Sequence, residues 1–270
     1  MNHYTGGEPL PTDALGVPLL TRRQRMLLAL TSLLFTLGLW WLVAASGWVD
    51  KILLPPPGEV LAAFHASVAD GSLLRNVVAS LTRVLEGFAV ALVIAVPLGV
   101  AMGVSRIVYG LVDPLLELLR PIPPIAVIPL AILWFGIDEL SKVFIIAYGA
   151  FFPILVNTLA GFREVERVQV RAAQALGAKR FHIFRDVVLR SAFPFIIVGA
   201  RLGMSMAFIV LVAAELIASS AGLGFMISDA RYNFRTDQMF LGMACIGVLG
   251  FMLNALLLRL ERSLLKWKSP

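Results

Sequence analysis

Charged residues are scarce in this 270-residue chain: they form 15% of it, whereas hydrophobic residues form 59% and the mean hydropathy is +0.87. A water-soluble domain of this length needs more polar surface than these values allow. The scarcity excludes an ordinary soluble globular fold. Because several apolar runs approach about 20 residues, the length of a membrane-spanning helix, we expect an α-helical integral membrane protein.

Cysteine and histidine are also nearly absent, with one cysteine and three scattered histidines. Cys245 cannot form an intramolecular disulfide, and its apolar surroundings predict a small packing residue. The chain lacks the Gly-rich loop ending in Lys and Ser or Thr that cradles nucleotide phosphates. It also lacks a Cys/His cluster and a credible catalytic triad. We therefore expect no catalytic residue, no metal and no cofactor in this chain.

Six apolar runs predict an all-α, polytopic fold with six transmembrane helices. Residues 1–25 are predicted to form a cytoplasmic N-terminal tail, and residues 26–270 a single membrane domain. The first run is longer than the core of about 7–15 residues of a signal peptide, which favours an uncleaved span, although 44–46 weakly resembles a cleavage site. The expected spans are 26–46, 80–104, 112–136, 139–162, 195–219 and 238–260.

Most of the 23 basic residues lie before the first span, between the fourth and fifth spans, and after the sixth. The positive-inside rule places these regions, and with them both termini, in the cytoplasm. The basic charge is therefore explained by orientation in the membrane, and we expect no nucleic-acid partner. On the outer side, residues 59–70 are predicted to form a short helix on the membrane surface.

Prolines crowd the third span, at Pro121, Pro123, Pro124 and Pro129. Each lacks a backbone donor and opposes a straight helix. Irregular backbone at membrane depth is tolerated only where protein or a water-filled passage surrounds it. A single proline would predict a harmless kink, but four in this short stretch predict a break beside a translocation path.

A basic, amphipathic segment at 163–194 separates the fourth and fifth spans. Its apolar residues recur at helical spacing up to Gly177, and a second amphipathic turn follows through Phe181, Phe184 and Val188. Two short helices joined at a glycine predict a docking element for a soluble partner. The alternative is a surface helix that only anchors the neighbouring spans.

The segment resembles the EAA loop of bacterial ABC importer permeases. Ala172 and Ala173, then Gly177, then Val187 and Leu189 fit its spacing, whereas Arg171 replaces the usual Glu and Arg190 the usual Pro. The motifs at 54–57, 120–124, 134–137, 213–218 and 222–224 are similar to those of the nitrate/sulfonate/taurine/bicarbonate permeases, with the taurine permeases most alike.

This resemblance implies the type I ABC importer permease (MetI-like) architecture in the bacterial inner membrane. It also implies a second copy of the chain, two cytoplasmic ABC ATPase subunits that bind ATP and Mg, and an extracytoplasmic substrate-binding protein that meets the loops 55–58 and 221–237. The cargo is expected to be a small anion, namely taurine or another alkanesulfonate. The residues expected to couple to the ATPase are Arg171, Ala172, Ala173, Leu176, Gly177 and Ala178.

Ionisable residues within spans are costly and often functional. Arg83 and Glu86 lie three apart and are predicted to pair on one helix face. Arg120 and Arg201 would attract an anion, or would instead pair with Glu117, Glu215 or backbone carbonyls. The candidate path residues are Arg120, Pro124, Arg201, Met204, Phe208 and Glu215.

Three alternatives remain open at this level. The first is a permease of the same family that carries nitrate or bicarbonate. The second is a secondary transporter or channel that acts without ATP, which six spans alone would allow. The third, an intramembrane enzyme, is disfavoured because no nucleophile with a base and no metal cluster lies in a span.

Overall fold

The structure is a computed structural model that describes residues 21–265, and over this range it contains helices and loops but no strand. The predicted tail lies almost wholly outside the described residues, as do Lys266 and Lys268. The chain divides into two compact units, Met1–Glu59 and Val60–Pro270, and each is described by itself. The prediction of one domain from residue 26 onward stays a prediction.

The described part of the first unit is formed by helix α1, Arg22–Ala45, and the loop after it. Thr21 caps α1 through a capping box, because its hydroxyl accepts from the Gln24 N–H while the Gln24 side chain accepts from the Thr21 N–H. Trp40 Nε1 donates to the Pro55 carbonyl at 3.1 Å, which closes the loop back onto α1. Helix α2, Pro57–Ala69, begins inside the proline run and confirms the expected short helix at 59–70.

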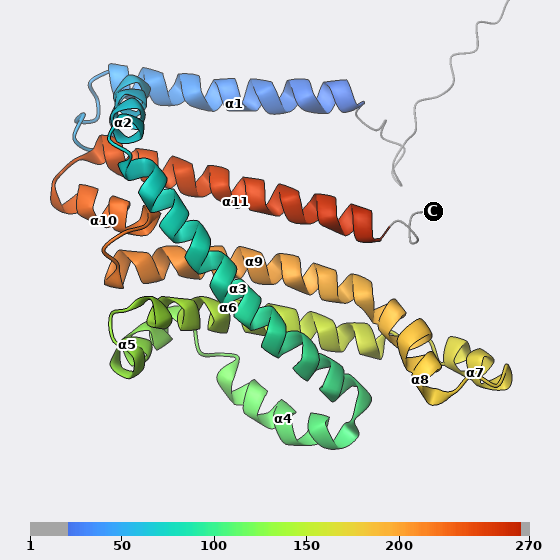
Figure 1. Cartoon of the computed structure of the whole chain (residues 1–270). Coiled ribbons are helices and arrows are strands. Elements are labelled where there is room, and N and C mark those ends of the chain that lie inside the picture. The colour runs from blue at the N-terminus through green and yellow to red at the C-terminus, as the bar shows by residue number, and fades with distance from the viewer. Residues whose placement is uncertain (1–20, 266–270) are drawn as a thin grey trace, which may run out of the picture. The chain divides into compact units, whose positions relative to one another are not determined.

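Three long helices form the core of the second unit: α3, Ser72–Val104; α6, Glu139–Arg163; and α9, Leu189–Ala218. Figure 1 shows α6 and α9 running side by side, with α3 crossing them. Small residues allow the close approach. A Cβ on Gly203 would lie 2.6 Å from the Ile154 side chain, so this position requires glycine.

The last helices, α10, Leu223–Tyr232, and α11, Thr236–Leu264, pack against each other beside α9. Residues 221–237 were expected to form a loop, whereas most of this stretch is α10. With ten residues, α10 is too short to appear as a span, and Gly222 precedes it while Gly224 lies in its first turn.

The expected third span is broken, as predicted. Helix α4, Arg106–Leu119, and helix α5, Pro124–Phe135, meet at a bend of 98°. The break is confined to residues 120–123. Pro124 is the first residue of α5, a position whose N–H makes no helical hydrogen bond, so proline is tolerated there. Pro129 lies inside α5. The predicted break at 121–129 was therefore too long.

Five described helices are long and apolar enough to span a membrane, and the bent pair α4 and α5 makes a sixth. The all-α polytopic fold is thus confirmed. The boundaries differ: α3 begins at Ser72 rather than at residue 80, and α4 begins at Arg106 rather than at residue 112. Both extensions are amphipathic turns, which a search for continuous apolar runs passes over.

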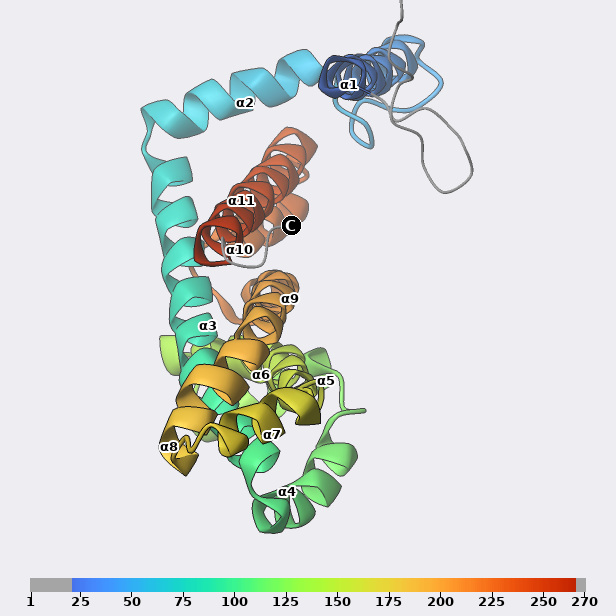
Figure 2. The ribbon, with the colours of Figure 1, turned by 90° about the vertical axis from the view of Figure 1, so that its right-hand side faces the viewer.

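The segment between α6 and α9 folds into α7, Arg167–Ala175, the single turn α8, Arg180–His182, and the π-helix η1, Ile183–Val188, which continues into α9. Figures 1 and 2 show α7 and α8 together at one end of α6 and α9. In Figure 1, α5 and α10 lie at the opposite end.

Candidate functional site

A Schellman motif ends helix α7 and explains the spacing of the EAA-like residues. The Ala178 N–H donates to the Ala173 carbonyl at 3.0 Å, and the Gly177 N–H donates to the Gln174 carbonyl at 2.9 Å. Gly177 adopts φ +78°, the left-handed conformation that this cap requires. No heavy atom lies within 4 Å of a Cβ built on Gly177. The left-handed turn, and not crowding within the chain, is therefore what favours glycine at this position.

The apolar row predicted on this segment faces away from the rest of the chain. Val168 is 73% exposed, Leu176 is 88% exposed, and Phe181, just beyond the turn, is 65% exposed. Val165 and Val170 are half-buried on the inner side. An exposed apolar row on a basic segment is the arrangement of a surface that a partner covers.

The six predicted coupling residues do not share one face. Ala172 and Leu176 are exposed on the outer side, and Gly177 and Ala178 complete the cap. Arg171, which stands where the motif usually has Glu, lines a cavity behind α7. The row that the structure leaves uncovered thus includes Val168, the first residue of the predicted docking segment 168–180, and Phe181, just beyond it; neither is among the six.

A second group of predicted residues meets at the break between α4 and α5. Arg120 and Pro124 line a cavity of about 480 Å³ together with Asn157 of α6 and Leu202 and Ser205 of α9. Arg120 also lines a neighbouring cavity of about 340 Å³, whose other polar residues are Tyr109, Asp113, Glu117, Arg163 and Glu164. Within residues 21–265 Arg120 forms no salt bridge.

Tyr148 supports the broken backbone. Its hydroxyl lies 3.0 Å from the carbonyl oxygen of Leu119 and 3.4 Å from that of Ile122. The Leu119 carbonyl also accepts from the Ile122 N–H at 3.1 Å, so the hydroxyl adds a second contact to the turn at the break. No pattern in the sequence indicates this role for Tyr148.

The remaining path candidates lie elsewhere. Met204 and Phe208 are 5% and 9% exposed and line a different cavity, against α11. Arg201 pairs with Glu261 of α11 at 3.0 Å, rather than with Glu117 or Glu215. Arg201, Met204 and Phe208 thus lie on the side of α9 that faces α11 and not on the side that faces the break. This favours a role in packing α9 against α11.

Glu215 is buried in a polar network at the opposite end of the core. Its carboxylate lies 2.8 Å from Arg83 Nη1, accepts from the Ser80 hydroxyl at 2.8 Å, and accepts from the Gly224 N–H at 2.9 Å. Glu215 is 1% exposed. A buried carboxylate with three donors is a structural centre, and this geometry favours that role over a place in the path.

The network continues from Arg83 to the start of α6. Arg83 Nη2 donates to Glu139 Oε1 at 2.7 Å, and Lys142 Nζ lies 3.0 Å from the same oxygen. The predicted pair of Arg83 with Glu86 is therefore wrong, because the guanidinium points into the core while Glu86 is exposed. The three-residue spacing on one helix indicated Glu86, whereas the acidic partners of Arg83, Glu139 and Glu215, belong to α6 and α9.

Backbone groups of the turn before α10 complete the network. The Leu223 N–H donates to Ser80 Oγ at 2.8 Å, the Gly222 N–H donates to Asn76 Oδ1 at 3.0 Å, and Arg83 donates to the Ala221 carbonyl. Gly222 has φ +120°, and a Cβ there would overlap the Glu215 carboxylate. Gly222 and Gly224 are thus required because the turn packs directly against Glu215, and a Cβ at either position would overlap it.

Comparisons with known proteins agree with this architecture. The family model described as "Binding-protein-dependent transport system inner membrane component" matches residues 74–267. The chain is 39% identical over 249 residues to the taurine transport system permease protein TauC of Escherichia coli, covering 90% of each chain. It is 36% identical over 233 residues to the putative aliphatic sulfonates transport permease protein SsuC of Bacillus subtilis, covering 86% of this chain and 84% of that protein.

Among solved structures, a chain of the MetNI methionine ABC transporter in an inward-facing conformation matches with a TM-score of 0.62 at 21% identity. The match covers 71% of this chain and 95% of that chain. At this identity the likeness shows the fold alone.

Proposed function

Because the chain belongs to the family of binding-protein-dependent inner membrane transport components, whose members are multi-pass ABC permease subunits rather than enzymes, we propose that it is the permease of an ATP-driven taurine or alkanesulfonate importer. It acts as a homodimer with two cytoplasmic ABC ATPase subunits, which bind ATP and Mg. A substrate-binding protein on the outer side delivers the anion. The similarity to TauC over 90% of both chains supports this cargo.

The observation that carries the proposal is the exposed apolar row on α7 and the turn after it. Val168, Leu176 and Phe181 together would leave a large apolar surface in water if nothing covered them. A groove on each ATPase subunit covers this row. The Schellman cap fixes the direction of the chain after α7. Movement of the ATPase is therefore passed through the segment to α6 and α9.

The translocation path runs beside the break between α4 and α5. Arg120 lines both cavities and forms no salt bridge within residues 21–265, so it is available to an anion. Pro124 and Ser205 supply a smooth, weakly polar wall. Such a wall binds the cargo weakly, which leaves selection to the binding protein.

Orientation follows from the basic segment. The end of the core that carries α7 and α8 lies in the cytoplasm, and the end that carries α5 and α10 faces the binding protein (Figure 1). Closure of the ATPase pair on ATP opens the path outward, and its separation after hydrolysis opens the path inward.

Co-purification with the ATPase tests the proposal. Val168→Asp and Leu176→Asp place a charge on the apolar row, and each is expected to reduce co-purified ATPase at least tenfold while the chain stays in the membrane. Phe234→Asp is the matched control, because Phe234 is 79% exposed at the opposite end of the core. Unchanged co-purification in both α7 variants would contradict the proposal and favour a transporter that acts without ATP.

The cargo is tested separately in vesicles that contain the whole importer. ATP-dependent uptake of labelled taurine, saturable by other alkanesulfonates, is expected. Uptake of nitrate or bicarbonate in place of taurine would assign the chain to another branch of the same family.

A further inference from the structure

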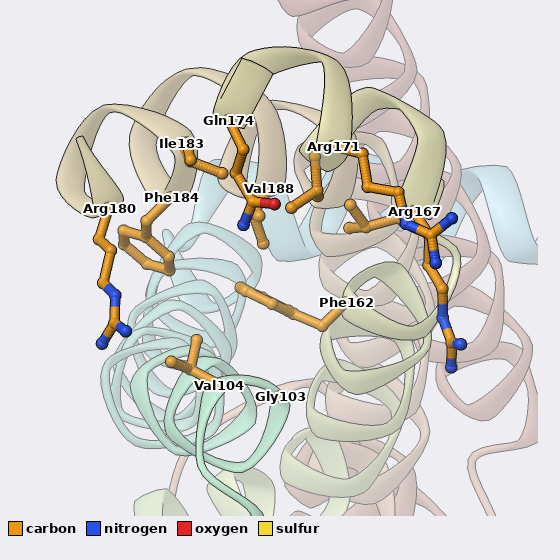
Figure 3. A pocket seen from close by; sticks show the side chains of 12 residues that line it. Gly103, Val104, Phe162, Arg167, Arg171, Gln174, Arg180, Ile183, Phe184 and Val188 are labelled. Atoms are coloured by element: carbon orange, nitrogen blue, oxygen red, sulfur yellow. The ribbon is translucent and has the colours of Figure 1, made fainter. Parts of the chain in front are cut away.

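A cavity of about 660 Å³ lies behind helix α7, between the cytoplasmic segment and the ends of α3 and α6 (Figure 3). Coupling to the ATPase uses the outer side of α7 and leaves this cavity without an assigned role. A water molecule occupies about 30 Å³ in the liquid, so the space is far larger than an inorganic ion needs.

Three arginines give the cavity its charge. Figure 3 shows Arg167 and Arg171 at one end and Arg180 at the other. Arg167 and Arg171 are four residues apart on α7, so they extend from the same helix face. No acidic side chain lines the cavity, and none of the three arginines forms a salt bridge within residues 21–265.

The rest of the lining is mainly apolar. Val104 and Phe162 lie on one side of the cavity, and Val170 and Ile183 belong to the segment on the other side. A small hydrophilic anion gains nothing from such walls. An amphiphile with an anionic head and a hydrocarbon tail matches both parts of the lining.

The position of the cavity agrees with such a ligand. Val104 is the last residue of α3, and Phe162 is the residue before the last of α6, so the cavity lies where two spanning helices leave the membrane. Clustered arginines at this level attract anionic lipid headgroups.

We propose that this cavity is a binding site for an anionic phospholipid, whose phosphate lies at Arg180 and whose acyl chain lies along Val104 and Phe162, while Arg167 and Arg171 at the other end add to the positive potential. The inference rests on the membrane spans of α3 and α6 and not on coupling to an ATPase. A bound lipid would fix the distance between α7 and the membrane.

Native mass spectrometry of the full-length chain, purified in detergent and titrated with one lipid at a time, tests the proposal without nucleotide. Dioleoylphosphatidylglycerol is expected to bind at least tenfold more tightly than dioleoylphosphatidylcholine. Arg180→Gln should reduce phosphatidylglycerol binding at least tenfold. Arg185→Gln removes the same charge from the same segment but pairs with Asp186 outside the cavity, so it should leave the binding unchanged.

Val104→Trp provides a second variant that keeps every charge, since it fills the apolar end of the cavity from an exposed position. It should also weaken phosphatidylglycerol binding at least tenfold. Equal binding of the two lipids, or full phosphatidylglycerol binding in both Arg180→Gln and Val104→Trp, would overturn the proposal. Displacement of phosphatidylglycerol by millimolar inorganic phosphate would assign the arginines to a free anion and would overturn it too.

Discussion

Arg83 and Glu215 lie 132 positions apart in the chain, yet their side chains meet at 2.8 Å with exposures of 5% and 0%. The pair joins α3 to α9, and through Glu139 and the turn before α10 it also holds α6 and α10. Breaking a buried pair by removing one partner typically costs about 3–5 kcal/mol. Loss of Glu215 would leave Arg83 with only Glu139, whose side chain is 60% exposed, as an acidic partner.

Glu215→Gln is therefore expected to lower the stability of the chain by up to about 3–5 kcal/mol, since Arg83 loses its buried partner and keeps only the exposed Glu139. Thermal unfolding of the purified chain in detergent measures the effect. Glu86→Gln is the control, because Glu86 is an exposed carboxylate one turn away on α3. Equal melting temperatures for the two variants would remove the argument that the network is structural.

Gly222→Ala is expected to destabilise the turn before α10, by at least about 1–3 kcal/mol, because φ is +120° and the added Cβ overlaps the Glu215 carboxylate. Gly247→Ala should be neutral or slightly stabilising, since its Cβ meets nothing within 4 Å. The same unfolding measurement compares them, and a stable Gly222→Ala variant would mean that the turn can rearrange.

Gly177→Val is expected to spare membrane insertion but to impair coupling. A β-branched residue at φ +78° is strained, and the strain of about 1–2 kcal/mol is relieved by loss of the Schellman cap. Gly177→Asn should retain most of the coupling, because asparagine tolerates this conformation. Substrate-stimulated ATP hydrolysis and uptake are the measurements; normal values for the valine variant would contradict the role assigned to the cap.

Arg120→Gln and Arg201→Gln should separate a path residue from a packing residue. The Arg120 variant is expected to assemble normally and to lose most uptake. The Arg201 variant loses the pair with Glu261, whose members are 32% and 20% exposed, so stability should fall by only about 0.5–1 kcal/mol while uptake persists. Uptake rates at matched expression decide between these outcomes, and the reverse pattern would move the path to the α11 side of α9.

Single cysteines on α9 test the same geometry directly, after Cys245 has been replaced by alanine. Cysteines at Leu202 and Ser205 line the cavity at the break and are expected to react with water-soluble thiol reagents in at least one nucleotide state. Cysteines at Met204 and Phe208 should react far more slowly, since these positions are buried against α11. Faster labelling at Met204 and Phe208 would restore them as gate residues.

The fold was largely predictable because its signals are local. Apolar runs revealed the spans, and four prolines revealed the break in the third. The glycine at 177 marked the end of α7, since a left-handed cap has few other solutions. The first turns of α3 and α4 were missed because they are amphipathic, and α10 was missed because ten residues are too few to carry a span signal.

The polar network was not predictable in its pairing. Arg83 and Glu215 each stood out as a charge in an apolar run, but sequence alone does not tell which helices touch. The nearest opposite charge in sequence, Glu86, was chosen wrongly. The side of α9 that faces the break was likewise undetermined, because small residues occur on both sides of that helix and only packing against α6 and α11 sets its rotation.

The residues of the polar network are synthesised far apart in time, which affects how α3 enters the membrane. Arg83 is synthesised with α3, 56 positions before Glu139 and 132 positions before Glu215. It must therefore enter the bilayer unpaired, at a cost of up to about 2.5–3.5 kcal/mol for a central arginine. The length and apolar character of α3, which has 33 residues, offset that penalty. In nascent chains truncated before α9, α3 should therefore be inserted while the Arg83 guanidinium has no Glu215 carboxylate to pair with.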